Sequence, residues 1–246
     1  MGTLAHIFRH PIKGVGAEAL SETRMDPGQA MPWDRAWAIA HEAARLQDGW
    51  TPCANFIRGA KSASLMAVTA STDTDTGRIT LSHPDRPTIT IDPETDGPAL
   101  VDWVRPITNP GRAAPTRLVH AGSRGMTDSD FPSVSILGLA SLRALSDKAG
   151  RDLDPRRFRG NFWIDGLGPW EEFEWIGRTL RIGTAEVEIR ERITRCTATT
   201  VDPETGRPDT DTLGLLDDGW GHQDLGVYGV VTSGGTARAG DPVALV

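Results

Sequence analysis

Cys196 is the residue whose neighbours point most clearly to chemistry. It is one of two cysteines in the chain; it follows Arg195 and precedes a threonine run that ends in the turn-forming residues 202–206. A thiolate is a strong nucleophile and a soft metal ligand, and nearby positive charge lowers the pKa of a thiol. Arg192 and Arg195 can supply that charge if both point toward the sulfur. Redox or metal chemistry is therefore expected first at Cys196.

The residue type alone leaves other roles open for both cysteines. A single cysteine in a strand-rich chain is also typical of a small buried hydrophobic side chain. Cys53 has no comparable motif around it, and we interpret it as structural. The two cysteines lack the spacing of a zinc or iron–sulfur site, so free thiols in a reducing compartment are expected. Electrons for a redox reaction would then come from a separate donor protein.

A basic turn lies upstream of the cysteine. Asp154 and Pro155 are typical of a helix N-cap and first helical position, and Arg156, Arg157 and Arg159 follow them. A guanidinium binds phosphate oxygens in pairs. The turn could therefore bind an anion, although a solvated basic turn is the alternative.

Composition limits the class of protein. The 246 residues include 26 Lys and Arg against 33 Asp and Glu, for a formal net charge of -7. This balance argues against a nucleic-acid binder, which carries a basic footprint. No secretory signal and no apolar run of roughly 18 residues is recognisable, so we expect a cytoplasmic protein with no membrane association. An anionic ligand would need a local cluster of arginines.

The elements that must position these residues are mainly short strands. Runs of β-favouring residues alternate with Gly, Pro, Asp and Thr turn clusters, which predicts a mainly β (α+β) fold with a few helices, containing a barrel or folded sheet. Helices are predicted at 138–148 and 98–104, and 209–218 is interpreted as a solvated acidic segment. The predicted strands are 4–8, 37–40, 65–70, 78–82, 88–91, 117–120, 162–164, 185–189, 228–232 and 243–246.

Residues 195–206 resemble the cysteine motif of the MOSC family, named after the C-terminal domain of molybdenum cofactor sulfurases. Residues 10–14 (His-Pro-Ile-Lys-Gly), 33–37 (Trp-Asp-Arg-Ala-Trp) and 156–161 (Arg-Arg-Phe-Arg-Gly-Asn) agree with the family in the expected order. The resemblance covers almost the whole chain. It implies a MOSC N-terminal β domain in 1–105 packed against a MOSC β-barrel in 106–246, divided near residues 106–112. The chain is similar to amidoxime-reducing-component-type proteins, without an iron–sulfur domain.

The resemblance also implies a ligand, the molybdenum cofactor (molybdopterin with Mo). Cys196 matches the family cysteine that ligates molybdenum, and would be both the metal ligand and the catalytic residue. Arg159 and Asn161 match cofactor-binding positions, and Lys13 and Arg35 match residues that reach the pterin and its phosphate end. From composition alone, Lys13 and Arg35 would be ordinary surface charges.

Two parts of the implied site are less regular. The family usually has serine where this chain has Gly14, so only the backbone N–H could make that contact. Thr127, Asp128 and Ser129 precede a strand and helix where the family supplies short polar groups, and we predict that they contact the cofactor. A turn without a ligand is the alternative for this segment.

The resemblance leads to competing functions for the same cysteine. The first is a molybdenum-dependent oxidoreductase that reduces small-molecule N-hydroxylated or N-oxide substrates. The second is a sulfur-carrier or cofactor-handling protein that uses a Cys196 persulfide, and the third is a silent binding module. The metal-ligand hypothesis requires that residues distant in sequence, including Lys13, Arg35, Arg159 and Asn161, converge around Cys196 in the fold.

Overall fold

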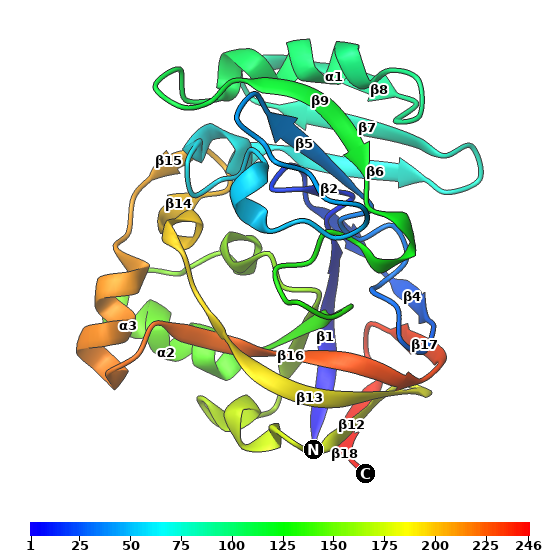
Figure 1. Ribbon diagram of the computed structural model, residues 1–246. Helices are drawn as coiled ribbons and strands as arrows, with labels where there is room; N and C mark the ends of the chain where they lie inside the picture. The colour runs from blue at the N-terminus through cyan, green and yellow to red at the C-terminus, as the bar shows by residue number, and fades with distance from the viewer.

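A closed seven-stranded β-barrel forms the lower half of the molecule in Figure 1. The structure is a computed structural model, which describes residues 1–246 and every side chain except that of Ser123. In order around the barrel, its strands are β1 (Gly2–Arg9), β11 (Phe162–Asp165), β10 (Val134–Gly138), β16 (Asp224–Ser233), β13 (Ala185–Thr194), β12 (Thr179–Ile182) and β18 (Pro242–Leu245). The barrel closes because β1 pairs with β11 on one edge and with β18 on the other. The short strand β3 (Glu18–Leu20) pairs with the second half of β1, whereas β18 pairs with its first residues.

Alternating side chains explain why these segments form a barrel. In β13, Ala185, Val187 and Ile189 are buried in the barrel core, whereas Glu186 and Glu188 between them are partly exposed. Successive side chains of a strand point to opposite faces, so this sequence gives β13 one apolar face and one polar face. The predicted mainly β fold with a barrel and a few helices is confirmed.

A second unit of two three-stranded sheets and one helix lies above the barrel in Figure 1. Apolar residues between its sheets and its helix form a separate core. Strand β1 comes from the start of the chain yet belongs to the barrel, so the two units interlock. The elements of the second unit are β2 (Ile12–Lys13), β5 (Trp37–His41) and β9 (Pro115–His120), β6 (Thr69–Asp73), β7 (Arg78–His83) and β8 (Arg86–Ile91), and α1 (Gly97–Val104).

The other two helices, α2 (Leu139–Ala149) and α3 (Thr212–Trp220), pack on the barrel through leucines that include Leu142, Leu145 and Leu216. Helix α2 ends as predicted, because Gly150 adopts the left-handed conformation at its C-terminus. Short pairs and 3-10 turns complete the chain: β4 (Glu22–Met25) with β17 (Gly235–Arg238), β14 (Val201–Asp202) with β15 (Arg207–Pro208), and η1 (Cys53–Asn55), η2 (Ala63–Ala67), η3 (Arg105–Ile107), η4 (Gly122–Arg124), η5 (Pro155–Phe158), η6 (Glu171–Trp175) and η7 (Thr197–Thr200).

Two sequence-based predictions of local structure were wrong. The first part of the strand predicted at 65–70 is the 3-10 turn η2, because Leu65 N–H bonds back to the Ser62 carbonyl. The segment 209–218, interpreted as solvated, contains most of helix α3. The Asp211 side chain caps this helix at Gly214 N–H, and Leu216 is fully buried.

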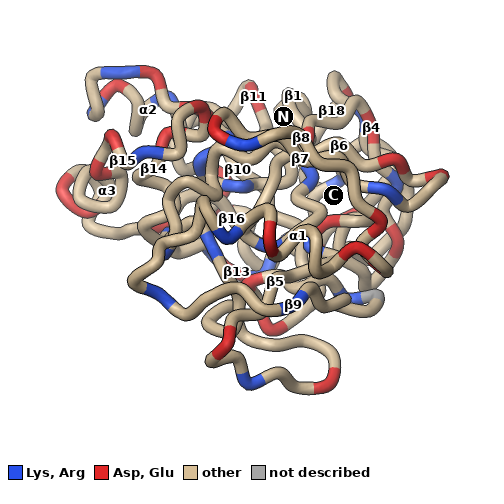
Figure 2. Tube along the Cα trace, turned by 90° about the horizontal axis from the view of Figure 1, so that it is seen from above, with Lys and Arg blue, Asp and Glu red and all other residues tan. Residues whose placement is uncertain are grey.

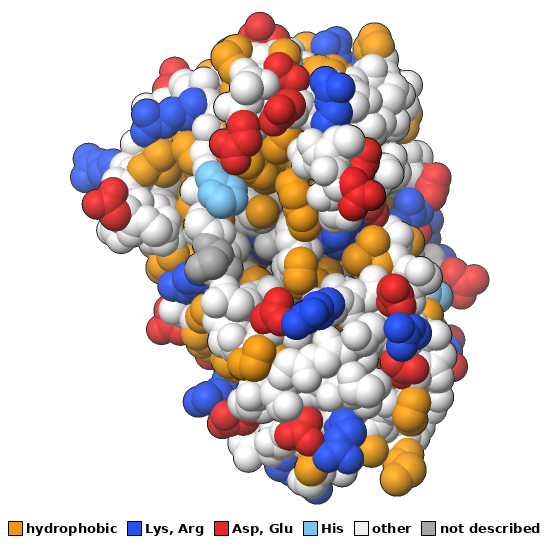
Figure 3. Space-filling view, turned by 90° about the vertical axis from the view of Figure 1, so that its right-hand side faces the viewer, with side chains coloured by type: hydrophobic (Ala, Val, Ile, Leu, Met, Phe, Trp, Pro, Cys, Tyr) orange, Lys and Arg blue, Asp and Glu red, His pale blue; other side chains and the backbone are white. Residues whose placement is uncertain are grey.

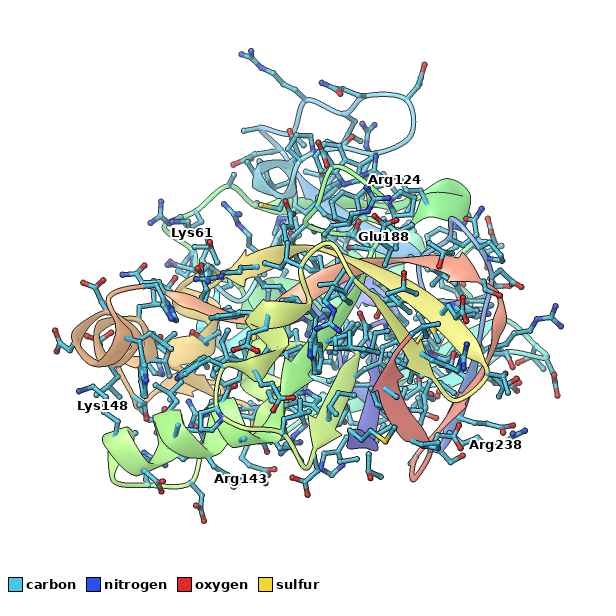
Figure 4. The ribbon with its side chains drawn as sticks, turned by 90° about the horizontal axis from the view of Figure 1, so that it is seen from below. Lys61, Arg124, Arg143, Lys148, Glu188 and Arg238 are labelled. Carbon is cyan, nitrogen blue, oxygen red and sulfur yellow. The ribbon has the colours of Figure 1, made fainter. Side chains whose placement is uncertain are left out.

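Basic and acidic residues are interspersed along the chain (Figure 2). Arg143 and Lys148 of α2 project outward from the molecule (Figure 4). Within the described residues, none of the helices combines the length and the apolar character needed to cross a membrane.

Candidate functional site

A cavity of about 250 Å³ lies where the barrel meets the second unit. Its lining joins side chains from distant parts of the chain, namely Lys13, Arg35, Cys53, Asp128, Arg159 and Cys196. Larger grooves also open on the surface, and Figure 3 shows one face hollowed between two lobes with hydrophobic side chains in the hollow. One groove of about 640 Å³ is lined in part by Trp33, Trp37 and His120 and contains no cysteine. The smaller cavity is the one that holds reactive groups.

The cysteine loop brings Cys196 to this cavity from the end of β13. Arg195 anchors the loop, since its guanidinium donates to the Leu225 carbonyl and, over 2.9 Å, to the Phe158 carbonyl. Cys196 directly precedes the turn η7, and Thr199 donates to its carbonyl from both the backbone and the hydroxyl, at 3.1 and 3.0 Å. The backbone of Cys196 is therefore held in place, while the residue itself is exposed and lines the cavity.

Only one of the two arginines expected near the sulfur lies in the cavity wall. Arg195 lines the cavity together with Cys196. Arg192 instead stacks on the Phe173 ring, 4.2 Å from its centroid, with Nη1 3.9 Å from an Asp224 carboxylate oxygen. Of these two arginines, only Arg195 therefore lies in the cavity wall beside Cys196.

Lys13 and Asp128 form an ion pair in the cavity wall. The Lys13 ammonium is buried; it donates to Asp128 Oδ1 at 2.6 Å and to the Met126 carbonyl at 2.7 Å. Burial lowers the pKa of Lys13, while the Asp128 carboxylate opposes this shift. The Asp128 side chain is 52% exposed, so this polar group of the 127–129 segment can reach a ligand.

Arg35 and Arg159 bring a second and a third cation to the same wall. Both residues have left-handed backbones, with φ of 52° and 48°. Arg35 donates to the Asp34 carboxylate and, over 2.9 Å, to the Arg159 carbonyl; the Arg159 side chain donates to the Gly16 carbonyl at 3.1 Å. Burial and the neighbouring Arg35 charge lower the pKa of Arg159. An anion in the cavity would relieve this repulsion between like charges.

The Arg35 position depends on a buried pair behind it. Asp34 and His10 are both buried; Asp34 Oδ1 accepts from His10 N–H at 2.8 Å and lies 3.3 Å from its ring Nδ1. Although burial alone would lower the pKa of Arg35, the Asp34 carboxylate beside it raises that pKa. Asp34 therefore keeps Arg35 charged and oriented toward the cavity.

Acid is expected to destabilise the protein through His10. Burial, with a smaller effect of Arg159, lowers its pKa from 6.5 to about 3. The unfolded chain thus takes up this proton well before the folded chain does. The free energy of unfolding should therefore fall as the pH drops below about 6.5, by at most about 1.4 kcal/mol per pH unit from this group. Urea unfolding of His10→Gln at neutral and acidic pH should show a shallower dependence. His6→Gln, at an exposed histidine, is the control, and equal slopes for both variants and the wild type would count against this role.

Three residues predicted to bind the cofactor do not line the cavity. The Asn161 side-chain amide accepts from Ser135 N–H and Oγ at 3.0 and 2.8 Å and donates to the Phe8 carbonyl. Thr127 and Ser129 are buried, and the hydroxyls of both donate to the Phe131 carbonyl. Asn161 thus supports Ser135, which does line the cavity. Cofactor contacts by these three residues stay predictions.

The cavity also contains residues that the sequence did not single out. Tyr228, the single tyrosine of the chain, reaches the cavity from β16, and its hydroxyl has no hydrogen-bond partner among the described residues. Burial raises the pKa of Tyr228, so its phenol stays protonated. Cys53 and Arg58 are in the lining as well, although Cys53 was interpreted as structural. No local motif marks these three residues in the sequence.

This arrangement suits an anionic ligand that also carries a soft metal. Cys196 offers one exposed sulfur, and Lys13, Arg35 and Arg159 offer positive charge in the same wall. Among the described residues, no three His, Cys, Asp or Glu side chains are grouped as a metal site. The donor set fits the molybdenum cofactor, whose pterin brings a dithiolene pair and a phosphate of its own.

Comparison with known families divides the chain into two matched parts. A model described as the MOSC N-terminal beta barrel domain matches residues 1–103, and a model described as the MOSC domain matches residues 124–244. Together the two models account for most of the chain, including the cysteine loop and all the cavity residues named above.

Known proteins that are similar to this chain include two mammalian ones. Mitochondrial amidoxime-reducing component 1 of Mus musculus is 26% identical over 293 residues, and its Homo sapiens counterpart is 25% identical over 296 residues; both alignments span 100% of this chain and 83% of the relative. Among solved structures, the YUAD protein from Bacillus subtilis aligns with 98% of this chain and 93% of its own, at 11% identity and a TM-score of 0.49. The chain belongs to the MOSC family, with a MOSC N-terminal beta barrel domain followed by a MOSC domain.

Proposed function

We propose that this protein binds the molybdenum cofactor, with Cys196 as a metal ligand, and reduces N-hydroxylated or N-oxide small molecules. One observation carries the proposal: Cys196 and three cations, Lys13, Arg35 and Arg159, line a single cavity although they are spread over most of the chain. The two amidoxime-reducing relatives support the class of substrate.

Each of these residues would have a distinct part in binding. The cations Lys13, Arg35 and Arg159 would hold the phosphate and pterin, because charge-assisted hydrogen bonds to phosphate are strong. Asp128 orients Lys13, and Asp34 orients Arg35. The bound cofactor would supply a metal that exchanges oxygen and electrons, and the chain supplies orientation and charge.

The cavity wall would help to orient the substrate oxygen, while the protons that the reaction consumes would come from water. Reduction of an N-hydroxyl group to N–H consumes a pair of electrons and a pair of protons and releases water. The Tyr228 phenol stays protonated and lacks a partner among the described residues, so it can donate a hydrogen bond to the substrate oxygen. The electrons would come from a separate donor protein.

A sulfur-carrier function is the second candidate, and the exposure of Cys196 favours it. A persulfide on an accessible cysteine could pass its sulfur to another protein. The two functions differ in what the protein contains. If the protein is an oxidoreductase, the chain purified from a molybdate-supplied host should contain about one molybdenum and one pterin. It should also reduce benzamidoxime when a chemical electron donor is supplied. Sulfane sulfur in the absence of both molybdenum and pterin would instead establish the second.

A further inference from the structure

Arg58 differs from the other cations of the cavity in its partners. Its Nη1 donates to Cys53 Sγ at 2.7 Å, and among the described side chains it has no carboxylate partner. Carboxylates pair with three other cavity cations, Lys13 with Asp128, Arg35 with Asp34 and Arg157 with Asp209. Arg159 and Arg195 instead donate to backbone carbonyls, so Arg58 is the cavity cation whose side-chain partner is a thiol. A cysteine sulfur is a weak hydrogen-bond acceptor, so the Arg58 guanidinium keeps most of its capacity for an anion.

Gly14 is what allows Arg58 to reach the cavity. At Gly14, φ is 73°, and a Cβ there would lie 2.8 Å from the Ile57 carbonyl oxygen and 2.9 Å from Arg58 Cα. A serine at position 14 would collide with this backbone, whereas glycine accepts both the close approach and the left-handed conformation. The chain thus lacks the usual family hydroxyl at this position and has the Arg58 backbone packed against it instead.

The same segment contacts the cysteine loop. The Thr197 hydroxyl donates to the Ala60 carbonyl at 3.2 Å, and a Cβ added at Gly59 would lie 3.5 Å from Ala198 Cβ. Arg58 is therefore held between the Gly14 turn and the loop that carries Cys196. Its position in the wall is set by backbone packing on both sides.

We infer that Arg58, supported by Cys53, is an oxyanion-binding subsite of the cavity that accepts a phosphate or a carboxylate. A guanidinium binds either group through paired hydrogen bonds. The subsite adds detail to the proposed function. Only the identity of its ligand rests on that function. The oxyanion would be either the phosphate of the cofactor or a carboxylate of the substrate.

The positive potential at Arg58 can be measured without any cofactor. In the full chain carrying Cys196→Ser, Cys53 is the remaining thiol, and its alkylation rates with iodoacetate, an anion, and iodoacetamide, which is neutral, can be compared. The ratio of the two rates cancels changes in the reactivity of the thiol itself. Adding Arg58→Gln should lower the iodoacetate-to-iodoacetamide ratio by roughly threefold to tenfold, because a local cation concentrates anions. Inorganic phosphate should slow the alkylation only when Arg58 is present.

Controls separate this effect from general charge and from misfolding. Lys61→Gln removes an exposed cation at the outer edge of the molecule (Figure 4) and should leave the ratio unchanged. Arg58→Lys keeps the charge and should retain most of the ratio. An unchanged ratio in Arg58→Gln, with no protection by phosphate in its parent, would overturn the inference.

The source of the oxyanion is identified with protein purified from a molybdate-supplied host. If the cofactor phosphate binds at Arg58, Arg58→Gln should lower the molybdenum and pterin content several-fold. If a substrate carboxylate binds there, the KM for 4-carboxybenzamidoxime should rise about tenfold or more while that for benzamidoxime stays unchanged. If Arg58→Gln changes neither the cofactor content nor the KM for 4-carboxybenzamidoxime, the inference is also overturned. If the wild-type protein contains no molybdenum or pterin while the Cys196→Ser chain shows the Arg58-dependent ratio, the proposed function is contradicted and the subsite is supported.

Discussion

Replacing Cys196 with alanine is expected to abolish benzamidoxime reduction, with turnover at least about a hundredfold below the wild type. Loss of partners that only support a metal ligand already costs roughly 10- to 100-fold, so loss of the ligand itself should cost more. Because Cys196 is exposed, the fold should be little affected. Turnover, molybdenum content and the urea midpoint of the purified variant test this together.

Cys196→Ser is the companion variant, since it keeps the size of the side chain and removes the soft sulfur. It should be as inactive as the alanine variant, with a urea midpoint like that of the wild type. Wild-type turnover in either variant would show that Cys196 is no ligand of the reacting metal. A large fall in the urea midpoint would instead assign Cys196 a structural role.

The second large effect is expected at Arg159. Arg159→Gln should lower the molybdenum and pterin content of the purified protein about tenfold or more, because a charge-assisted contact to the anionic cofactor is lost. The free protein should not be destabilised to a similar extent, since burial and Arg35 already disfavour the charge of Arg159. Cofactor content after gel filtration and urea unfolding measure the two effects separately.

Arg192→Gln is the matched control for Arg159. Arg192 lies on the same side of the cysteine in sequence as Arg195, but its guanidinium stacks on Phe173 outside the cavity lining. Its removal should leave the cofactor content unchanged. Equal losses in Arg159→Gln and Arg192→Gln would mean that general surface charge, and not a site, retains the cofactor.

Much of the site could be predicted because it is encoded in local motifs. Cys196, Lys13, Arg35 and Arg159 each lie in a short segment that resembles the family, and all line the same cavity. Asp128 was one of three neighbouring candidates, and the structure places only this one in the lining. The Thr127 and Ser129 side chains point into the protein and bond to the Phe131 carbonyl. Residue type alone does not determine which of the three neighbouring side chains lines the cavity.

The remaining site residues depend on contacts between distant segments. Arg58 reaches the cavity because its backbone packs on Gly14, and no pattern around residue 58 records that contact. Tyr228 faces the cavity through the register of β16 in the closed barrel. Asn161 shows the converse, since a residue in a binding motif is bonded to the protein itself, through Ser135 and Phe8.

The fold shows the same division between local and distant information. Runs of β-favouring residues between turn clusters predicted most of the barrel strands, although β12 was not among the predicted strands, and Gly150 predicted the end of α2. Helix α3 was missed because Gly214, Gly219 and two aspartates lower its intrinsic helix propensity, whereas burial of Leu216 stabilises it in the folded protein. Propensity is outweighed here by tertiary packing, which a single sequence does not reveal.

Molybdenum X-ray absorption on the purified protein tests the central claim most directly, because it counts the sulfur atoms bound to the metal. If Cys196 is a ligand, the wild type should show the dithiolene pair and one further sulfur, and Cys196→Ser should show the pair alone. The same sulfur count in both proteins would contradict the assignment of Cys196 as a metal ligand.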